Sequence, residues 1–343
     1  MDGGALLFWR DGWLLSGGQS GAHDDFCIKS ANPFLAVASM KQSIIWDKLR
    51  NPWLRQPRGA QPWCTIVCST SEYISRDTMS EDQSAAMPVL NDKDCYGFER
   101  KSAGDFPFYR EGPHALSARH WVVLLLGAAL GFSMLTVPIA FFKTTMGGFV
   151  PAILFPLIPL AVLAIMVGKG WCALFRTPTW RDVLLMVAIA GANILVSFTV
   201  ALLLQLVFKM NANPANALLA EASDTALILF YLKTAPQLFG EEVVSILPFL
   251  AVLWFCHQRL AMTRKRAIIT AWVCTALIFG ALHLPTYEWN FVQCFLVIGT
   301  ARIVLLSGYI ITKNIWVSTG AHIINDWLLF TIMAAFLGTH AAG

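Results

Sequence analysis

Residues 227–255 form a long apolar segment that reads LILFYLKTAPQLFGEEVVSILPFLAVLWF. Two adjacent carboxylates, Glu241 and Glu242, lie inside it, and the segment carries almost no other charge. Ionisable side chains at membrane depth are energetically costly, so they are tolerated mainly where they have a partner or a function. Two later apolar segments offer partners, namely His283 in one and His322 with Asp326 in the other. A buried set of carboxylates and imidazoles is therefore the feature that any function must explain.

The composition places the chain among integral membrane proteins. Of its 343 residues 56% are apolar and only 13% are charged, whereas soluble domains carry roughly 25% charged residues. The net charge of +4 comes from Lys and Arg residues that lie largely in short segments between apolar runs. Basic residues in such short loops typically set the orientation of a protein in the membrane. We therefore expect the lipid bilayer as a partner and no nucleic acid.

The apolar runs predict an all-α, polytopic bundle of transmembrane helices. A span needs about 20 apolar residues, and seven runs qualify: 121–142, 149–167, 183–208, 226–255, 267–284, 291–312 and 315–336. We expect about seven spans, or eight if the 226–255 run crosses twice.

Basic loops indicate the orientation of these spans. The loop 257–266 contains four basic residues and no acid, and further basic residues lie in 169–181 and just before the first span. The positive-inside rule places such loops in the cytoplasm. All three fall on one side only if the 226–255 run crosses once, as one long helix that bends near Pro236, Gly240 or Pro248. The prediction is a multi-pass protein of the plasma membrane with its N-terminus in the cytoplasm.

The chain divides near residue 118. Residues 1–118 are polar and lack a sustained helical or alternating period, which predicts a largely disordered cytoplasmic region. Residues 119–340 form the predicted transmembrane domain. The opening residues contain too short an apolar run for a signal peptide, so the first span is expected to direct insertion.

The two glutamates differ in direction if they lie on a helix. Adjacent helical residues point about 100° apart, so only one of Glu241 and Glu242 can face a given centre. Burial favours the neutral form of a carboxyl group and makes it a suitable general base near neutral pH. Alternatively, the pair caps backbone groups near a helix break at Gly240.

Each histidine lies four residues from a plausible companion. His283 follows Phe279 on one helical face, and His322 precedes Asp326 by one turn with Asn325 on the same side. A carboxylate orients an imidazole in both metal sites and hydrolytic sites. The alternatives are a satisfied interfacial histidine for His283 and an interhelical polar clasp for the other pair.

Taken together, the three patterns resemble a family of membrane proteases. The order Glu241-Glu242, Phe279-Gly-Ala-Leu-His283 and His322-Ile-Ile-Asn-Asp326 is similar to that of the CPBP family, which includes type II CAAX prenyl endopeptidases and bacterial bacteriocin-processing or abortive-infection (Abi) proteins. The resemblance covers residues 225–336, which would form the protease-like core. One departure is that the family's first motif reads Glu-Glu-x-x-x-Arg, whereas Ile246 stands at the arginine position. That arginine would pair with a carboxylate and hold it ionised.

The resemblance implies an intramembrane endopeptidase that acts on a membrane-bound peptide or protein, including lipidated ones. Glu241 would be the general base, Glu242 would support it or exchange roles with it, and His283 would orient the water. His322 and Asp326 would face the developing negative charge, with Phe279 and Asn325 in supporting positions. We expect no cofactor, because no histidine pair shares one helical turn. The alternative is Zn²⁺ held by Glu241, His283 and His322.

Two other functional classes stay open. The first is a catalytically inactive membrane scaffold or immunity protein of the same fold, for which Ile246 is the main sequence argument. The second is a proton- or cation-coupled transporter that uses the carboxylates as a relay.

Overall fold

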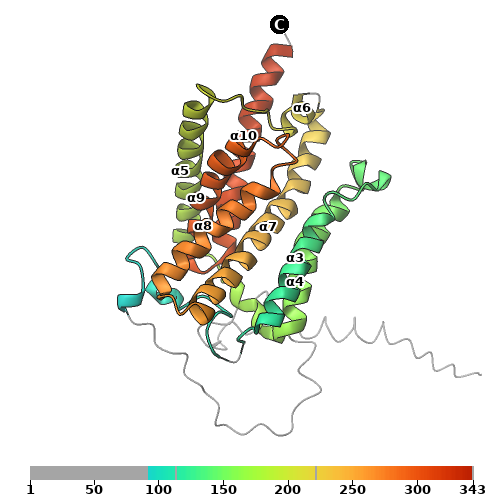
Figure 1. The fold of residues 1–343 in the computed structure, drawn as a ribbon. Coiled ribbons are helices and arrows are strands. Elements are labelled where there is room, and N and C mark those ends of the chain that lie inside the picture. The colour runs from blue at the N-terminus through green and yellow to red at the C-terminus, as the bar shows by residue number, and fades with distance from the viewer. Residues whose placement is uncertain (1–91, 113, 221, 342–343) are drawn as a thin grey trace, which may run out of the picture. The chain divides into compact units, whose positions relative to one another are not determined.

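A computed structural model describes residues 92–112, 114–220 and 222–341. Helices dominate this part of the chain, which contains no β-strand, so the predicted all-α class is confirmed for it (Figure 1). The predicted disorder of residues 1–91 lies outside the described residues. The helices are α3 (Ala118–Ser133), α4 (Phe149–Val167), α5 (Trp180–Gln205), α6 (Ala215–Ala220), α7 (Asp224–Trp254), α8 (Arg264–Leu282), α9 (Gly299–Thr312) and α10 (Ile315–Ala341).

In the part of the chain that the structure describes, five helical segments are long and apolar enough to cross a membrane: Phe149–Leu174, Trp180–Gln205, Asp224–Arg259, Arg264–Leu282 and Gln293–Thr312. Large apolar side chains such as Leu126, Ile165 and Leu195 also point outward, as a lipid environment permits. The chain is thus a membrane protein.

The first predicted span is shorter than expected. The sequence predicted an apolar span over 121–142, but α3 ends at Ser133 after 16 residues. Pro138 disfavours helical geometry at the residue before it and supplies no backbone N–H. The chain beyond Ser133 therefore turns and continues into the short 3₁₀-helix Ala140–Lys143.

Helix α7 is the centre of the bundle. It runs without a break through Pro236 and Pro248 and continues into the π-helical turn Phe255–Arg259, which confirms one long helix. Within its most apolar part 72% of the residues are buried, against 22–44% in the other four candidate spans. Helix α7 contacts α3, α4, α8, α9 and α10.

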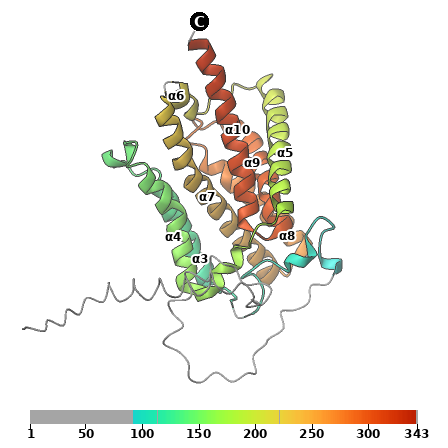
Figure 2. The same cartoon turned by 180° about the vertical axis from the view of Figure 1, so that it is seen from behind.

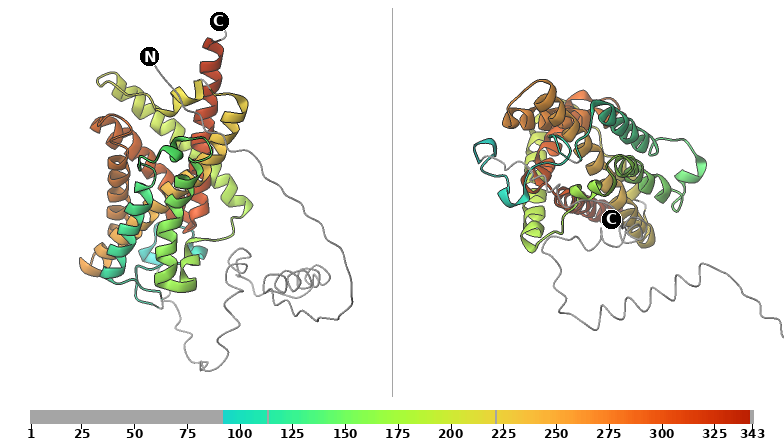
Figure 3. Two further views of the ribbon diagram at one scale, coloured as in Figure 1. Left: turned by 90° about the vertical axis from the view of Figure 1, so that its right-hand side faces the viewer. Right: turned by 90° about the horizontal axis from the view of Figure 1, so that it is seen from below.

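The other helices surround α7 in two groups. Helix α10 packs against α5, α7 and α9, as the reverse view in Figure 2 shows. The α3 and α4 helices pack together and against α7 on another side of the bundle (Figure 3). This arrangement brings α7, α9 and α10 into mutual contact, which positions the site.

A segment before α3, residues 92–117, packs on the helix ends, and we call it the strap. Phe106, Tyr109 and Leu116 of the strap are buried in the same apolar core as α7. We predicted that all of residues 1–118 lie outside the helical domain. For the described residues of the strap that prediction is wrong. Aromatic residues spaced without a period gave no local signal, because their partners are supplied by distant helices.

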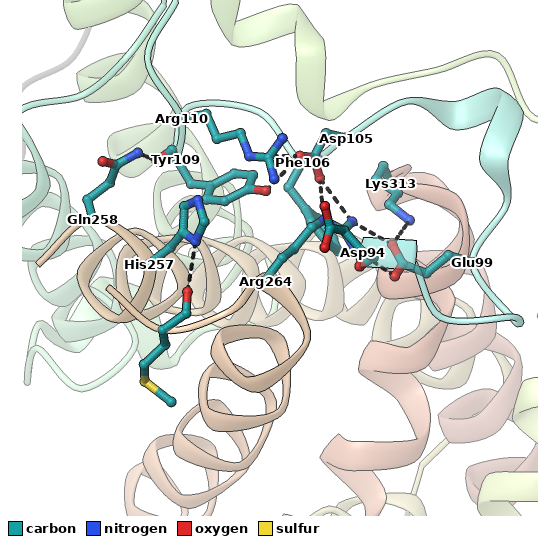
Figure 4. A network of polar contacts seen from close by, with 11 residues as sticks. Asp94, Glu99, Asp105, Phe106, Tyr109, Arg110, His257, Gln258, Arg264 and Lys313 are labelled. Carbon is teal, nitrogen blue, oxygen red and sulfur yellow. Dashed lines mark hydrogen bonds and ion pairs between the residues drawn. The ribbon is translucent and has the colours of Figure 1, made fainter. Parts of the chain in front are cut away.

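Buried charges fasten the strap to the bundle (Figure 4). Arg264 donates to both carboxylate oxygens of Glu99, at 2.8 and 2.6 Å, and to Asp105 at 3.0 Å. Lys313 also donates to Glu99, at 2.6 Å. Burial would raise the pKa of Glu99, but the hydrogen bonds from Arg264 and Lys313 outweigh it and lower that pKa to about 2. We call Glu99, Asp105, Arg264 and Lys313 the strap cluster.

The sequence expected Arg264 in a basic loop spanning 257–266. Instead it is the first residue of α8 and is 2% exposed, because the strap supplies the carboxylates that compensate its charge.

Candidate active site

The two glutamates of α7 lie in different environments. Glu242 is completely buried, whereas the side chain of Glu241 is 15% exposed. Gln237, one turn earlier, donates a long hydrogen bond of 3.4 Å to Glu241. The helical offset between neighbours thus separates one enclosed carboxylate from one accessible carboxylate.

Glu242 joins three helices. Its Oε1 atom accepts hydrogen bonds from Nη1 of Arg302 on α9 at 2.5 Å and from Nδ1 of His322 on α10 at 2.9 Å. A carboxylate can only accept, so His322 carries a proton on Nδ1 in this arrangement. The Oε2 atom of Glu242 and Nε of Arg302 are buried without a hydrogen-bond partner among the described residues.

The opposite side of His322 faces two further carboxylates. Its Nε2 atom lies 3.8 Å from Oε2 of Glu241 and 3.7 Å from Oδ1 of Asp326. These separations exceed a direct hydrogen bond. The structure thus brings together four of the five predicted catalytic residues, with Nε2 of His322 at the centre.

A chain of amides holds Asp326. Asn325 donates to Asp326 at 2.8 Å, and Asn193 on α5 donates to the side-chain oxygen of Asn325 at 2.9 Å. Asn193 is 2% exposed. Sequence reasoning missed Asn193, although an amide within the apolar run 183–208 was an available signal.

The tilted rings of Phe279 and His283 lie against each other at the C-terminal end of α8. Nδ1 of His283 lies 2.9 Å from the Phe279 carbonyl, and the two rings are 4.5 Å apart. Among the described residues, no hydrogen bond or ion pair joins His283 to the four residues of the site. The direct role predicted for it stays a prediction.

Tyr287 lies between His283 and the site. Its ring stacks against His283 at 6.5 Å. Burial, followed by the nearby charges of Asp326, Cys294 and Glu241, raises the pKa of Tyr287 to about 12. His283 therefore borders the site through Tyr287.

The predicted zinc ligands are not gathered. Within the described ranges no group of three His, Cys, Asp or Glu side chains is arranged to hold a metal ion. Glu241 and His322 are neighbours, but His283 turns its Nδ1 toward its own helix. The zinc alternative stays a prediction, and Asp326 lies 3.7 Å from Nε2 of His322.

Arg302 is the second residue that sequence reasoning missed. It is the one basic residue of the apolar run 291–312, which was a signal in itself. Ile246, at the position of the family's arginine, is completely buried in the apolar core. Position 246 thus supplies no positive charge to the site, and the cation beside Glu242 comes from α9.

No protein-family model, curated protein or solved structure matches the chain. The function must therefore be argued from the chemistry of the site.

Proposed function

We propose that the protein is an intramembrane endopeptidase that hydrolyses a peptide bond of a membrane-associated peptide or protein. The observation that carries the proposal is that Glu241 and Asp326 flank Nε2 of His322 at 3.8 and 3.7 Å within an apolar helical bundle. The resemblance of the three motifs to the CPBP proteases supports the same reaction class.

The gaps around Nε2 suit a bridging water molecule. Two polar atoms separated by more than 3.5 Å are commonly linked in this way. Glu241, the more accessible carboxylate, is within reach of such a water and has the chemistry of a general base. It takes a proton as the water oxygen attacks the carbonyl carbon, and it passes that proton to the amine nitrogen when the C–N bond breaks.

His322 stabilises the developing oxyanion. When it is protonated, Nδ1–H stays on Glu242 and Nε2–H is free to donate to the carbonyl oxygen of the substrate. A preorganised donor of this kind contributes about 3 kcal/mol to the transition state. Asp326, held by Asn325 and Asn193, stabilises the charged imidazole.

The surroundings favour a substrate that enters from the membrane. Glu241 lies on a helix apolar enough to span a bilayer, and soluble peptides partition poorly to that depth. Prenylated C-terminal tails, leader peptides and membrane segments all meet this requirement.

Cleavage of two probes in proteoliposomes tests the proposal. The probes are an internally quenched farnesylated peptide with a C-terminal CAAX sequence and an unlipidated membrane-spanning peptide. We expect Glu241→Gln to abolish cleavage and Glu288→Gln, in an exposed loop, to cleave at the wild-type rate. Cleavage by Glu241→Gln at the wild-type rate would refute the proposal, and activity with and without a chelator separates glutamate catalysis from zinc catalysis.

The inactive-scaffold alternative rests on Ile246. It loses its main support because Arg302 supplies a positive charge to Glu242. We retain it as the reading that applies if neither probe is cleaved.

A further inference from the structure

Arg302 touches one residue from each of the three motifs. It donates to Glu242 at 2.5 Å, its Nη2 lies 3.5 Å from Nδ1 of His322, and its guanidinium carbon lies 3.6 Å from the centre of the Phe279 ring. These three residues come from α7, α10 and α8. A single side chain of α9 therefore lies where all three motifs meet.

The charge of Arg302 constrains its neighbours. Arg302 is completely buried, and a guanidinium is protonated at every physiological pH. A buried charge without a counter-charge is strongly destabilising. Glu242 is the acid with which it forms an ion pair, so Glu242 must be ionised.

The geometry differs from that of a purely structural ion pair. Arginine and carboxylate groups commonly pair through two parallel hydrogen bonds, as Arg264 and Glu99 do. In the site, Oε1 of Glu242 is shared between Arg302 and His322, while Oε2 has no hydrogen-bond partner within the described ranges. Arg302 and His322 are thus coupled through one oxygen atom.

We propose that Arg302 is a positioning residue that performs, from α9, the role of the arginine that α7 lacks at Ile246. It holds Glu242 as a carboxylate, and this carboxylate holds the proton of His322 on Nδ1. The Nε2 atom then faces Glu241 and Asp326. The aromatic face of Phe279, which precedes His283 in the second motif, lies against the guanidinium and stabilises its charge.

The effect of Arg302 on catalysis rests on the proposed function. The effect of Arg302 on the proton of His322 does not. The primary experiment is therefore NMR of the full-length protein in micelles, labelled with ¹⁵N-histidine, which distinguishes protonation on Nδ1 from protonation on Nε2. His322→Gln identifies the His322 signals. The variants are Arg302→Met, Arg302→Lys and, as a matched control, Arg264→Met, which breaks the strap cluster.

We expect Arg302→Met to reduce the Nδ1-protonated form of His322 and Arg302→Lys to retain part of it. Arg264→Met should leave the His322 signals unchanged. If Arg302→Met does not fold, Arg302→Met combined with Glu242→Gln removes both buried charges, and the Nδ1 preference should still be lost. Wild-type His322 signals in Arg302→Met, or in its combination with Glu242→Gln, would overturn the proposal.

Peptidase kinetics with the same variants provide the second measurement. A positioning role predicts at least a 100-fold loss of kcat in Arg302→Met with KM nearly unchanged, and partial recovery in Arg302→Lys. A merely structural role predicts equal losses in Arg302→Met and Arg264→Met, which would contradict the proposal. If the wild type cleaves neither probe, the proposed function fails, but the NMR result still decides whether Arg302 positions His322.

Discussion

Two buried groups of charges in this molecule are built in opposite ways. In the strap cluster both oxygens of Glu99 accept hydrogen bonds from cations, and Asp105 lies against Arg264 and also against Arg110, at 3.4 Å. In the site three carboxylates stand against one arginine and one histidine. In the part of the chain that the structure describes, Oε2 of Glu242 has no hydrogen-bond partner and Nε2 of His322 makes no direct hydrogen bond.

The difference separates a structural role from a chemical one. A buried ion cluster whose carboxylate oxygens all accept hydrogen bonds has little capacity left for a ligand, although removing one member is costly. An incompletely satisfied cluster retains acceptors and donors for a water or a substrate, which is common where titratable groups serve a function. The hydrogen bonds of the strap cluster are complete and those of the site are not. We therefore expect a chemical role for the site on α7 and α10 rather than for the strap.

The sharpest way to break this comparison is a reciprocal pair of substitutions. Glu241→Gln should lower kcat by at least about 100-fold and leave the thermal unfolding midpoint close to the wild-type value, because Glu241 is only weakly bonded. Glu99→Gln should lower the free energy of unfolding by about 3–5 kcal/mol and leave kcat of the folded fraction nearly unchanged. Activity assays and unfolding in detergent measure both, and the opposite assignment of effects would invalidate the comparison.

Acid should release the strap only far below neutral pH. The pKa of Glu99 is lowered from 4.5 to about 2 in the folded protein, so its stabilisation is complete above pH 4.5 and is lost as the pH falls toward 2. Hydrogen exchange of the backbone amides in residues 92–116 measures this release. The Glu99→Gln variant is the control, since its exchange should lack the transition, and release of the wild-type strap at pH 5–6 would contradict the prediction.

Lys313→Met should have a smaller effect on the strap cluster than Glu99→Gln. Glu99 keeps both hydrogen bonds from Arg264 and loses only that from Lys313. A hydrogen bond to a charged group contributes about 1.5–3 kcal/mol. The free energy of unfolding, measured in detergent, should decrease by that amount. A loss as large as that of Glu99→Gln would mean that Arg264 alone does not satisfy Glu99.

Asn193→Ala should have the smallest effect of these substitutions. It removes the hydrogen bond that holds Asn325, which in turn holds Asp326, so we expect a several-fold decrease in kcat and a loss of about 1 kcal/mol in stability. Thr199→Val on the exposed side of the same helix is the control for both measurements. An unchanged kcat in Asn193→Ala would show that Asp326 keeps its position without α5.

Much of the fold could be predicted because lipid imposes simple rules. Backbone groups at membrane depth must bond within their own helix, so apolar runs directly indicate helices, and α7 is one helix as expected. The strap and the early end of α3 could not be predicted in this way. The strap depends on contacts between residues as distant as Glu99 and Arg264, and these leave no periodic pattern in either segment.

By itself, the sequence determined that the protein is a helical membrane protein whose apolar helices carry carboxylates and imidazoles, because hydropathy and residue type are local properties. Motif order predicted that five of these residues belong to one site, and the structure brings four of them together. Only the tertiary structure decided that Glu241 is accessible while Glu242 is enclosed, and that the arginine absent at Ile246 is supplied by Arg302, 60 residues beyond Glu242. The pairing of buried charges depends on which helices pack together. Contacts between distant helices are not a local property of the sequence.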